Sequence, residues 1–141
     1  YYNRLHVTIN VDDDGVGGAV TDRLREIILE EGYHMTVNAC RNGAKANESD
    51  HYENWGAESW GTLRALLKDI QIQDDDELVA QLTSRKYHLT SKGKIALEKK
   101  KDMKKRGLPS PDRADALVLA FAKSTDDNII MNGIGGSLYG F

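Results

Sequence analysis

Apolar and polar residues alternate near the start of the chain, and this pattern predicts a β-strand. The apolar positions are Leu5, Val7, Ile9 and Val11, and one polar residue separates each from the next. A period of two places the apolar side chains on one face of the strand and the polar ones on the other. Asp12 belongs to the polar set and stands where the strand ends.

A strand–helix–strand unit is predicted over the first 40 residues. A glycine-rich turn at 15–18 leads into an amphipathic helix over 19–31, and Gly32 suits the left-handed position that often ends a helix. A second strand is predicted over 34–40. Two such strands pair in parallel through a right-handed crossover. Functional groups collect at the carboxyl ends of parallel strands, which is where Asp12 lies.

The middle of the chain predicts two helices and a hairpin. After a polar loop at 41–53, apolar residues recur at helical spacing over 55–70, and a shorter helix is predicted over 75–82. Two short strand patterns with a glycine-containing turn predict a β-hairpin over 87–98. A basic segment at 99–107 follows, and its pattern predicts a short helix.

The last predicted helix has a marked start and carries two acids. Ser110 is a good N-cap, and Pro111 has the backbone angle of a first helical residue. Asp112 and Asp115 are three positions apart, so they share one face of the helix. Every residue over 116–122 is apolar, which predicts a helix that is buried nearly all round.

These two acids have two interpretations. In the first, Asp112 favours the positive end of the helix dipole and Asp115 pairs with Arg113 or a lysine. In the second, they share a cation with Asp12, because unpaired acids at a strand end and a buried helix start need a common partner. The second interpretation predicts that Asp12 and Asp115 lie within a few ångströms of each other. The two acids that follow Asp12 are weaker candidates.

Composition and charge narrow the class of protein. The length of 141 residues, of which 40% are hydrophobic, suits one domain, predicted over 1–123, with a flexible glycine-rich tail over 124–141. A single cysteine excludes an internal disulfide, and no apolar run approaches the roughly 20 residues of a membrane helix. The net charge is −3, but basic residues are concentrated between Arg85 and Arg106. This segregation predicts a surface that binds a polyanion.

Three segments, taken in order, resemble the motifs of one nuclease family. They are residues 11–18 with 22–24, residues 52–60, and residues 110–117, and the basic hairpin lies between the second and the third. On these motifs the chain resembles the nuclease domain of a bacteriophage or prophage terminase large subunit. The resemblance implies an α/β, RNase H-like nuclease core, with a mixed sheet, flanking helices and an added β-hairpin.

The resemblance also implies a chemistry. Members of that family are endonucleases that cut concatemeric double-stranded DNA during genome packaging, with two Mg²⁺ or Mn²⁺ ions. Asp12 matches the acid that ends a central strand, and Asp115 matches the metal-binding acid of the C-terminal helix. Asp112 lies where relatives often carry another acid or a histidine. These three are the predicted catalytic and metal-binding residues, and hard oxygen ligands from separate elements suit Mg²⁺ and Mn²⁺.

Further expectations follow from the same resemblance. The family's core begins with a strand that carries the first catalytic aspartate, and this sequence starts after it, so we expect a partial core in which cation binding is weakened and the fragment can be inactive. The full-length parent would act with a terminase small subunit and a portal protein in the cytoplasm of the infected or lysogenic bacterial host, with no membrane. The residues predicted to bind DNA are Lys92, Lys94, Lys99, Lys101, Lys104, Lys105 and Arg106.

Two other functions stay open at this point. A Holliday-junction resolvase or transposase also uses an acid-ended strand and an Asp-x-x-Asp helix, but the glycine turn at 15–18 and the helix that follows residue 54 favour a terminase. A non-catalytic module that binds DNA or a portal is the second alternative. Separately, the lysines of the hairpin either bind DNA phosphates or only keep an exposed strand soluble.

Overall fold

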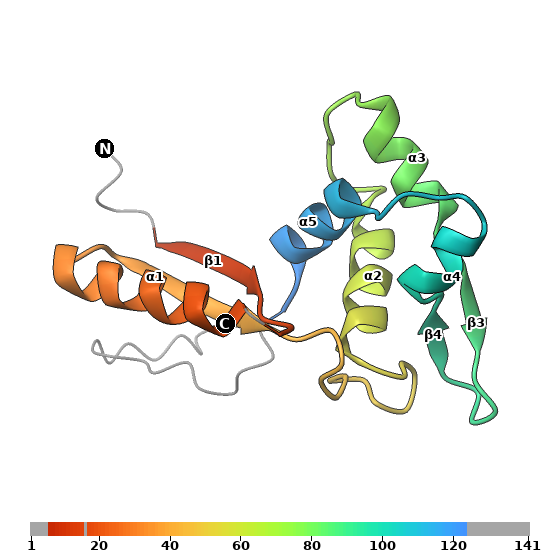
Figure 1. The fold of residues 1–141 in the computed structure, drawn as a ribbon, viewed down its shortest axis with the longest axis horizontal. Helices are drawn as coiled ribbons and strands as arrows, with labels where there is room; N and C mark the ends of the chain where they lie inside the picture. The colour runs from red at the N-terminus through yellow and green to blue at the C-terminus, as the bar shows by residue number, and fades with distance from the viewer. Residues whose placement is uncertain (1–5, 16, 124–141) are drawn as a thin grey trace, which may run out of the picture.

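Figure 1 shows the computed structural model of the chain, which describes residues 6–15 and 17–123. The predicted tail over 124–141 lies outside the described residues. The elements are, in order, β1 (Val7–Asp12), α1 (Gly17–Glu31), β2 (Met35–Cys40), α2 (Trp55–Leu66), α3 (Asp76–Ser84), β3 (Tyr87–Leu89), β4 (Ile95–Leu97), α4 (Lys100–Lys105) and α5 (Asp112–Phe121). None of the helices in this part of the chain is long and apolar enough to cross a membrane.

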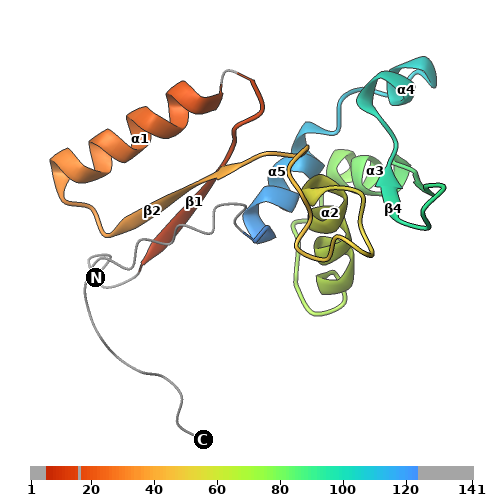
Figure 2. The same ribbon diagram turned by 90° about the horizontal axis from the view of Figure 1, so that it is seen from below.

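The predicted strand–helix–strand unit is confirmed. β1 and β2 pair in parallel, with Val7 opposite Met35 and Asp12 opposite Cys40, and α1 packs against both strands. β3 and β4 form the predicted antiparallel hairpin, which is a separate two-stranded sheet. In Figures 1 and 2, α5 lies between the strand–helix–strand unit and helices α2 and α3. It therefore joins the two halves of the molecule.

The polar face of β1 is turned toward α5. The side-chain amide of Asn10 donates to the carbonyl oxygens of Leu119 (2.7 Å) and Ala122 (3.3 Å), at the C-terminal end of the helix. The amide of Asn38 on β2 in turn donates to the side-chain oxygen of Asn10 (2.9 Å). The last carbonyls of a helix have no partner within the helix, so these bonds dock α5 and fix its distance from the strand.

The helical half has its own core. Trp55 and Leu63 of α2, Met103 of α4 and Val118 of α5 are each at most 4% exposed. The side-chain oxygen of Asn54 caps α2 by accepting the amide three residues later (2.9 Å). The helix predicted over 55–70 ends at Leu66, and Leu67 is its C-cap, whose backbone amide donates to the Leu63 carbonyl.

α5 is buried on one face only, so the prediction of a helix buried nearly all round is wrong. Ala114 and Val118 are buried, whereas Ala116, Ala120 and Phe121 are exposed. The reason is that α2, α3 and β1 are the elements that pack against α5, and they cover only part of its circumference. An uninterrupted apolar run cannot show which of its residues face these neighbours.

The start of α5 also differs from the prediction. The helix begins at Asp112 with Pro111 at the N-cap, and the Ser110 hydroxyl donates to the Asp112 carboxylate (2.6 Å) instead of capping the helix. The backbone amides of residues 113 and 114 donate to the side-chain oxygen of Gln81 on α3, at 2.8 and 3.0 Å. Amides at a buried helix start lack water, so a side chain of the neighbouring helix satisfies them.

Candidate metal and nucleic-acid site

Asp12 and Asp115, which lie at opposite ends of the described chain, line one cleft of about 590 Å³. The walls of this cleft come from the end of β1, the loop after β2, the start of α2, the hairpin, the start of α4 and α5. Its other titratable residues are Asp14, Glu53, Arg85, His88, Glu98, Lys99 and Lys100. The cleft is therefore lined by acidic and by basic side chains.

The docking of α5 on β1 explains why the two acids share the cleft. Asn10, which holds the Leu119 carbonyl, and Asp12 are two residues apart on one face of β1, which corresponds to about 6.6 Å along a strand. Asp115 precedes Leu119 by four residues, which corresponds to about 6 Å along a helix. The distance along β1 from Asn10 to Asp12 is thus similar to the distance along α5 from Leu119 back to Asp115. The contact between Asn10 and Leu119 therefore accounts for both acids lining one cleft.

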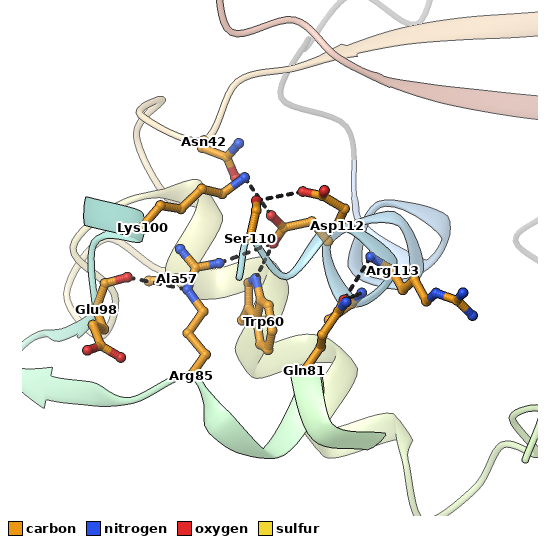
Figure 3. A network of polar contacts seen from close by, with 12 residues as sticks. Asn42, Ala57, Trp60, Gln81, Arg85, Glu98, Lys100, Ser110, Asp112 and Arg113 are labelled. Carbon is orange, nitrogen blue, oxygen red and sulfur yellow. Dashed lines mark hydrogen bonds and ion pairs between the residues drawn. The ribbon is translucent and has the colours of Figure 1, made fainter. Parts of the chain in front are cut away.

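Three side chains from three different elements contact Asp115. Trp60 of α2 donates its indole N–H to Oδ1 (3.2 Å), and Arg85, at the end of α3, donates to the same oxygen (3.1 Å). Lys100 of α4 forms an ion pair with Oδ2 (2.8 Å). Figure 3 shows all three pointing toward the start of α5. The predicted pairing of Asp115 with a lysine is confirmed.

Arg113, the other predicted partner of Asp115, points elsewhere. It forms ion pairs with Asp75 and with Glu77 (2.9 Å), both at the start of α3. Asp112 is exposed and accepts the Ser110 hydroxyl, and it is not among the residues that line the cleft. The two acids of α5 therefore have different surroundings although they share a helix face.

Asp12, the last residue of β1, and Asp13, which follows it, also differ from each other. Asp12 is exposed, and its Oδ1 accepts the backbone amide of Asp14 (3.2 Å). Asp13 is buried, and hydrogen bonds from Thr21 and then from Arg41 hold the pKa of its carboxyl below the ordinary value. Asp13 thus serves the fold, because its charge is satisfied inside the protein.

The donor chemistry of the cleft fits a hard divalent cation. Within 6–15 and 17–123, no group of three or more His, Cys, Asp and Glu side chains is placed to hold a metal. Mg²⁺ commonly takes one or two protein carboxylates and completes its octahedron with water and substrate phosphates. Asp12 and Asp115 match such a partial set of ligands, and a phosphate would complete it.

Some residues of the predicted basic surface are exposed to solvent, and others form ion pairs with acids of the protein. Lys92, Lys99, Lys101 and Lys104 are exposed, and Lys94 is half-buried. Two other members of the predicted set have acidic partners. Lys105 pairs with Asp102 (2.8 Å), and Arg106 pairs with Glu98 (2.6 Å).

Sequence reasoning missed several residues of the cleft. Lys100 belongs to the basic run, but it was not in the predicted set and it contacts the acid of α5. Glu53 stands just before the cap of α2 and lines the cleft, and its sequence context carries no signal of that position. Arg85 has no local signal either, because 30 positions separate it from Asp115. Only the packing of α3 against α5 brings them together.

No family model matches the sequence, and no curated protein matches it. Among solved structures, the chain is similar to the nuclease domain of the large terminase subunit gp2 of bacterial virus Sf6, with 22% identity and a TM-score of 0.63 over 84% of this chain. A mutant of that domain with manganese and beta-thujaplicinol, at the same identity, gives a TM-score of 0.66 over 82% of this chain.

A third structure, a mutant of the same Sf6 protein with calcium, gives 0.61 at 22% identity over 84% of this chain. The chain spans 65% of the length of each of these three structures. The likeness confirms the predicted α/β, RNase H-like fold class. The chain therefore has the fold of the nuclease domain of a phage terminase large subunit.

Proposed function

We propose that this chain is the divalent-metal-dependent endonuclease domain of a phage terminase large subunit and that it cuts double-stranded DNA during genome packaging. One observation carries the proposal: Asp12 and Asp115 line the same cleft in a fold shared with a viral nuclease domain. A mutant of the Sf6 domain was solved with manganese. A hard divalent cation in this cleft agrees with the carboxylates that line it.

Each acid has a proposed task in this function. Asp12 and Asp115, which line the cleft, hold a Mg²⁺ or Mn²⁺ ion. Asp112, which is exposed one turn before Asp115 and does not line the cleft, is the proposed third acid for a second ion. When bound, two such ions lower the pKa of the attacking water and stabilise the leaving oxygen of a phosphodiester. The protein contributes the position of the carboxylates on two docked elements, β1 and α5.

The basic residues have a separate task, which is to hold the DNA backbone. Lys99 and Lys100 line the cleft, and the exposed lysines of α4 and of the hairpin turn continue the positive charge away from it. Contacts between lysines and phosphates carry no sequence information. We therefore propose that grip on the duplex is independent of sequence and that cleavage position is decided by other parts of the packaging machinery.

A plasmid-nicking assay with Mn²⁺ tests the proposal. The full chain is expected to convert supercoiled plasmid to open circles only when Mn²⁺ is present, and Asp12→Asn or Asp115→Asn is expected to reduce nicking to the metal-free background. Asp50→Asn, which changes an exposed acid outside the cleft, is the matched control. Nicking by the Asp12 or Asp115 variant at the rate of the unmodified chain would contradict the proposed site.

A non-catalytic DNA-binding role is the second candidate. It is favoured by the ion pairs of Asp115, whose two oxygens already contact Arg85 and Lys100, and by the absence of a three-acid group among the residues that the structure describes. In this case the chain would bind duplex DNA with equal affinity with and without Mn²⁺ and would nick no plasmid. Titration of Mn²⁺ into the chain, followed by the electron paramagnetic resonance of the free ion, separates the two functions.

Partners and location belong to the proposal as well. If the chain is a terminase nuclease domain, its parent acts with a terminase small subunit and a portal protein in the cytoplasm of the bacterial host. Co-purification of the parent with those two proteins from infected cells would test this part.

A further inference from the structure

The two carboxylate oxygens of Asp115 are held in different ways. Oδ1 accepts two hydrogen bonds, from the Trp60 indole (3.2 Å) and from Arg85 (3.1 Å). Oδ2 contacts the ammonium of Lys100 (2.8 Å). The carboxylate is half-buried, with 24% of the side chain exposed. One oxygen is therefore bound to the interior of the helical half, and the other is bound to a side chain at the surface.

Arg85 is fixed on several sides. Its side chain is 11% exposed, its guanidinium carbon lies 5.0 Å from the centre of the Trp60 ring, and its Nε donates to the backbone carbonyl of Glu98 (3.3 Å). A planar guanidinium that stacks on an aromatic ring and binds a carbonyl keeps one orientation. Burial lowers the pKa of Arg85, while the neighbouring carboxylates of Asp115 and Glu98 favour its charged form.

Lys100 is held much less firmly. Its side chain is 47% exposed, and it reaches Asp115 from the short helix α4. A lysine stem has four rotatable carbons, and a partly exposed ion pair of this kind contributes little to stability. The ammonium can therefore leave Oδ2 without disturbing the fold. Arg85, in contrast, is held by the Trp60 ring and the Glu98 carbonyl, and Trp60 belongs to α2, which packs against α5.

We propose that Arg85 and Trp60 are positioning residues that clamp Oδ1 of Asp115 and leave Oδ2 as the oxygen available to a divalent cation. This inference rests on the proposed function, because it needs a cation in the cleft that Asp12, Arg85, Lys100 and Asp115 line. Neither residue touches the cation. They act through the orientation of one carboxylate.

The clamp has a chemical consequence for the ion. A carboxylate with one oxygen occupied by two donors binds a cation through its other oxygen alone. Single-oxygen binding leaves more of the octahedral positions of Mg²⁺ for water and phosphate. Groups that orient a metal ligand without touching the metal commonly change metal affinity by about 10- to 100-fold when they are removed.

Two conservative substitutions test the clamp in the full chain. Trp60→Phe keeps an aromatic ring and removes the indole donor, and Arg85→Lys keeps the charge but removes the planar fork. Each is expected to weaken Mn²⁺ binding, measured by isothermal titration calorimetry, by about tenfold. The matched controls are Trp55→Phe, whose indole donates to the Lys123 carbonyl, and Arg113→Lys, which pairs with acids of α3. Both controls should keep the affinity of the unmodified chain.

A second measurement follows the unmodified protein and needs a variant only to assign its signals. The chain has two tryptophans, so a nitrogen-15 spectrum of the unmodified protein has two indole N–H signals, and Trp60→Phe or Trp55→Phe assigns them. Addition of Mg²⁺ should shift the Trp60 signal along a saturating titration curve, because the carboxylate that accepts the Trp60 N–H binds the ion. The Trp55 signal should stay in place.

The outcomes separate this inference from the function on which it rests. If both Trp60→Phe and Arg85→Lys bind Mn²⁺ as tightly as the unmodified chain, or more tightly, the clamp is wrong but the metal site is retained. A Trp60 signal that does not shift when Mg²⁺ binds leads to the same conclusion. If the unmodified chain does not bind Mn²⁺, the proposed nuclease site is wrong, and so is the clamp, because it needs a bound cation.

Discussion

The role of each acidic residue in this chain depends on the donors that surround it. Asp13 and Glu58 are both buried, and donors of the fold satisfy them: Thr21 and Arg41 bind Asp13, and the amides of residues 47 and 48 bind Glu58. Asp12, one position before Asp13, is exposed and lines the cleft. Asp12 and Asp13 thus have separate tasks, because successive side chains of a strand point to opposite faces.

Glu98 gives a pH-dependent prediction at the residue scale. Its hydrogen bonds with Arg106 lower its pKa from 4.5 to about 2. A carboxyl whose pKa is lower in the folded state stabilises the fold above its unfolded pKa, and this stabilisation is lost as the pH falls through the folded pKa. Glu98→Gln should therefore lower the melting temperature at pH 7, and the difference from the unmodified chain should shrink between pH 4.5 and 2.

Circular dichroism melts of both proteins across that pH range check this prediction, with Asp50→Asn as the control for loss of an exposed acid. A difference in melting temperature that stays constant down to the acid limit would show that Glu98 contributes through packing and not through its charge.

Lys100 gives a second prediction at this scale. Its ammonium occupies Oδ2 of Asp115, so a cation that binds this oxygen must displace it. Lys100→Ala should raise Mn²⁺ affinity by about two- to fivefold, because a partly exposed ion pair contributes up to about 1 kcal/mol. Lys101→Ala, the next lysine on the same helix, should show a smaller gain. Weaker Mn²⁺ binding by Lys100→Ala in the same calorimetric titration would mean that Lys100 supports the site.

At the scale of elements, local periodicity predicted the helices and strands of the described chain, and long-range contacts decided their ends. The parallel pair and the hairpin follow from alternation and turn residues alone. The cap of α5 does not, because its acceptor is Gln81, more than 30 positions away in the sequence. The serine that suits a cap by local rules instead binds the carboxylate of Asp112.

Gln81 provides a test at this scale. Its side chain is 6% exposed, and its oxygen accepts two amides of α5. Gln81→Leu keeps a similar volume but leaves buried amides without an acceptor, so it should lower the free energy of unfolding by about 1–3 kcal/mol. Chemical denaturation in urea measures the change, and Gln73→Leu, at an exposed position, is the matched control. Equal stability of the two variants would exclude Gln81 as the cap.

At the scale of the whole molecule, the sequence predicted two of the acids that line the cleft, Asp12 and Asp115, but not the residues that surround them. Asp12 and Asp115 stand out locally, one at a strand end and one at a helix start. Their common cleft depends on the contacts of Asn10 with the end of α5, and the partners of Asp115 depend on how α2, α3 and α4 pack. Such contacts arise between distant segments, so no local pattern encodes them.

The hairpin turn carries positive charge at a distance from the cleft. Lys92 and Lys94 flank Gly93, whose positive φ of 74° allows the tight turn, and the strands of the hairpin contribute His88 and Leu97 to the cleft wall. A duplex whose phosphate lies in the cleft would pass this turn. We therefore expect both lysines to bind backbone phosphates and to release the counterions bound there.

Replacement of Lys92 and Lys94 by alanine should weaken duplex binding equally for unrelated sequences. The plot of log K against log[salt] should become flatter by about one to two units, because each lost phosphate contact removes about one unit of slope. Fluorescence anisotropy with two unrelated duplexes, at several salt concentrations, measures this slope. Lys45→Ala with Lys68→Ala removes the same charge at exposed positions elsewhere and should leave the slope nearly unchanged. Equal slopes for the two double variants would assign the hairpin lysines to solubility, since net charge alone would then explain any loss of affinity.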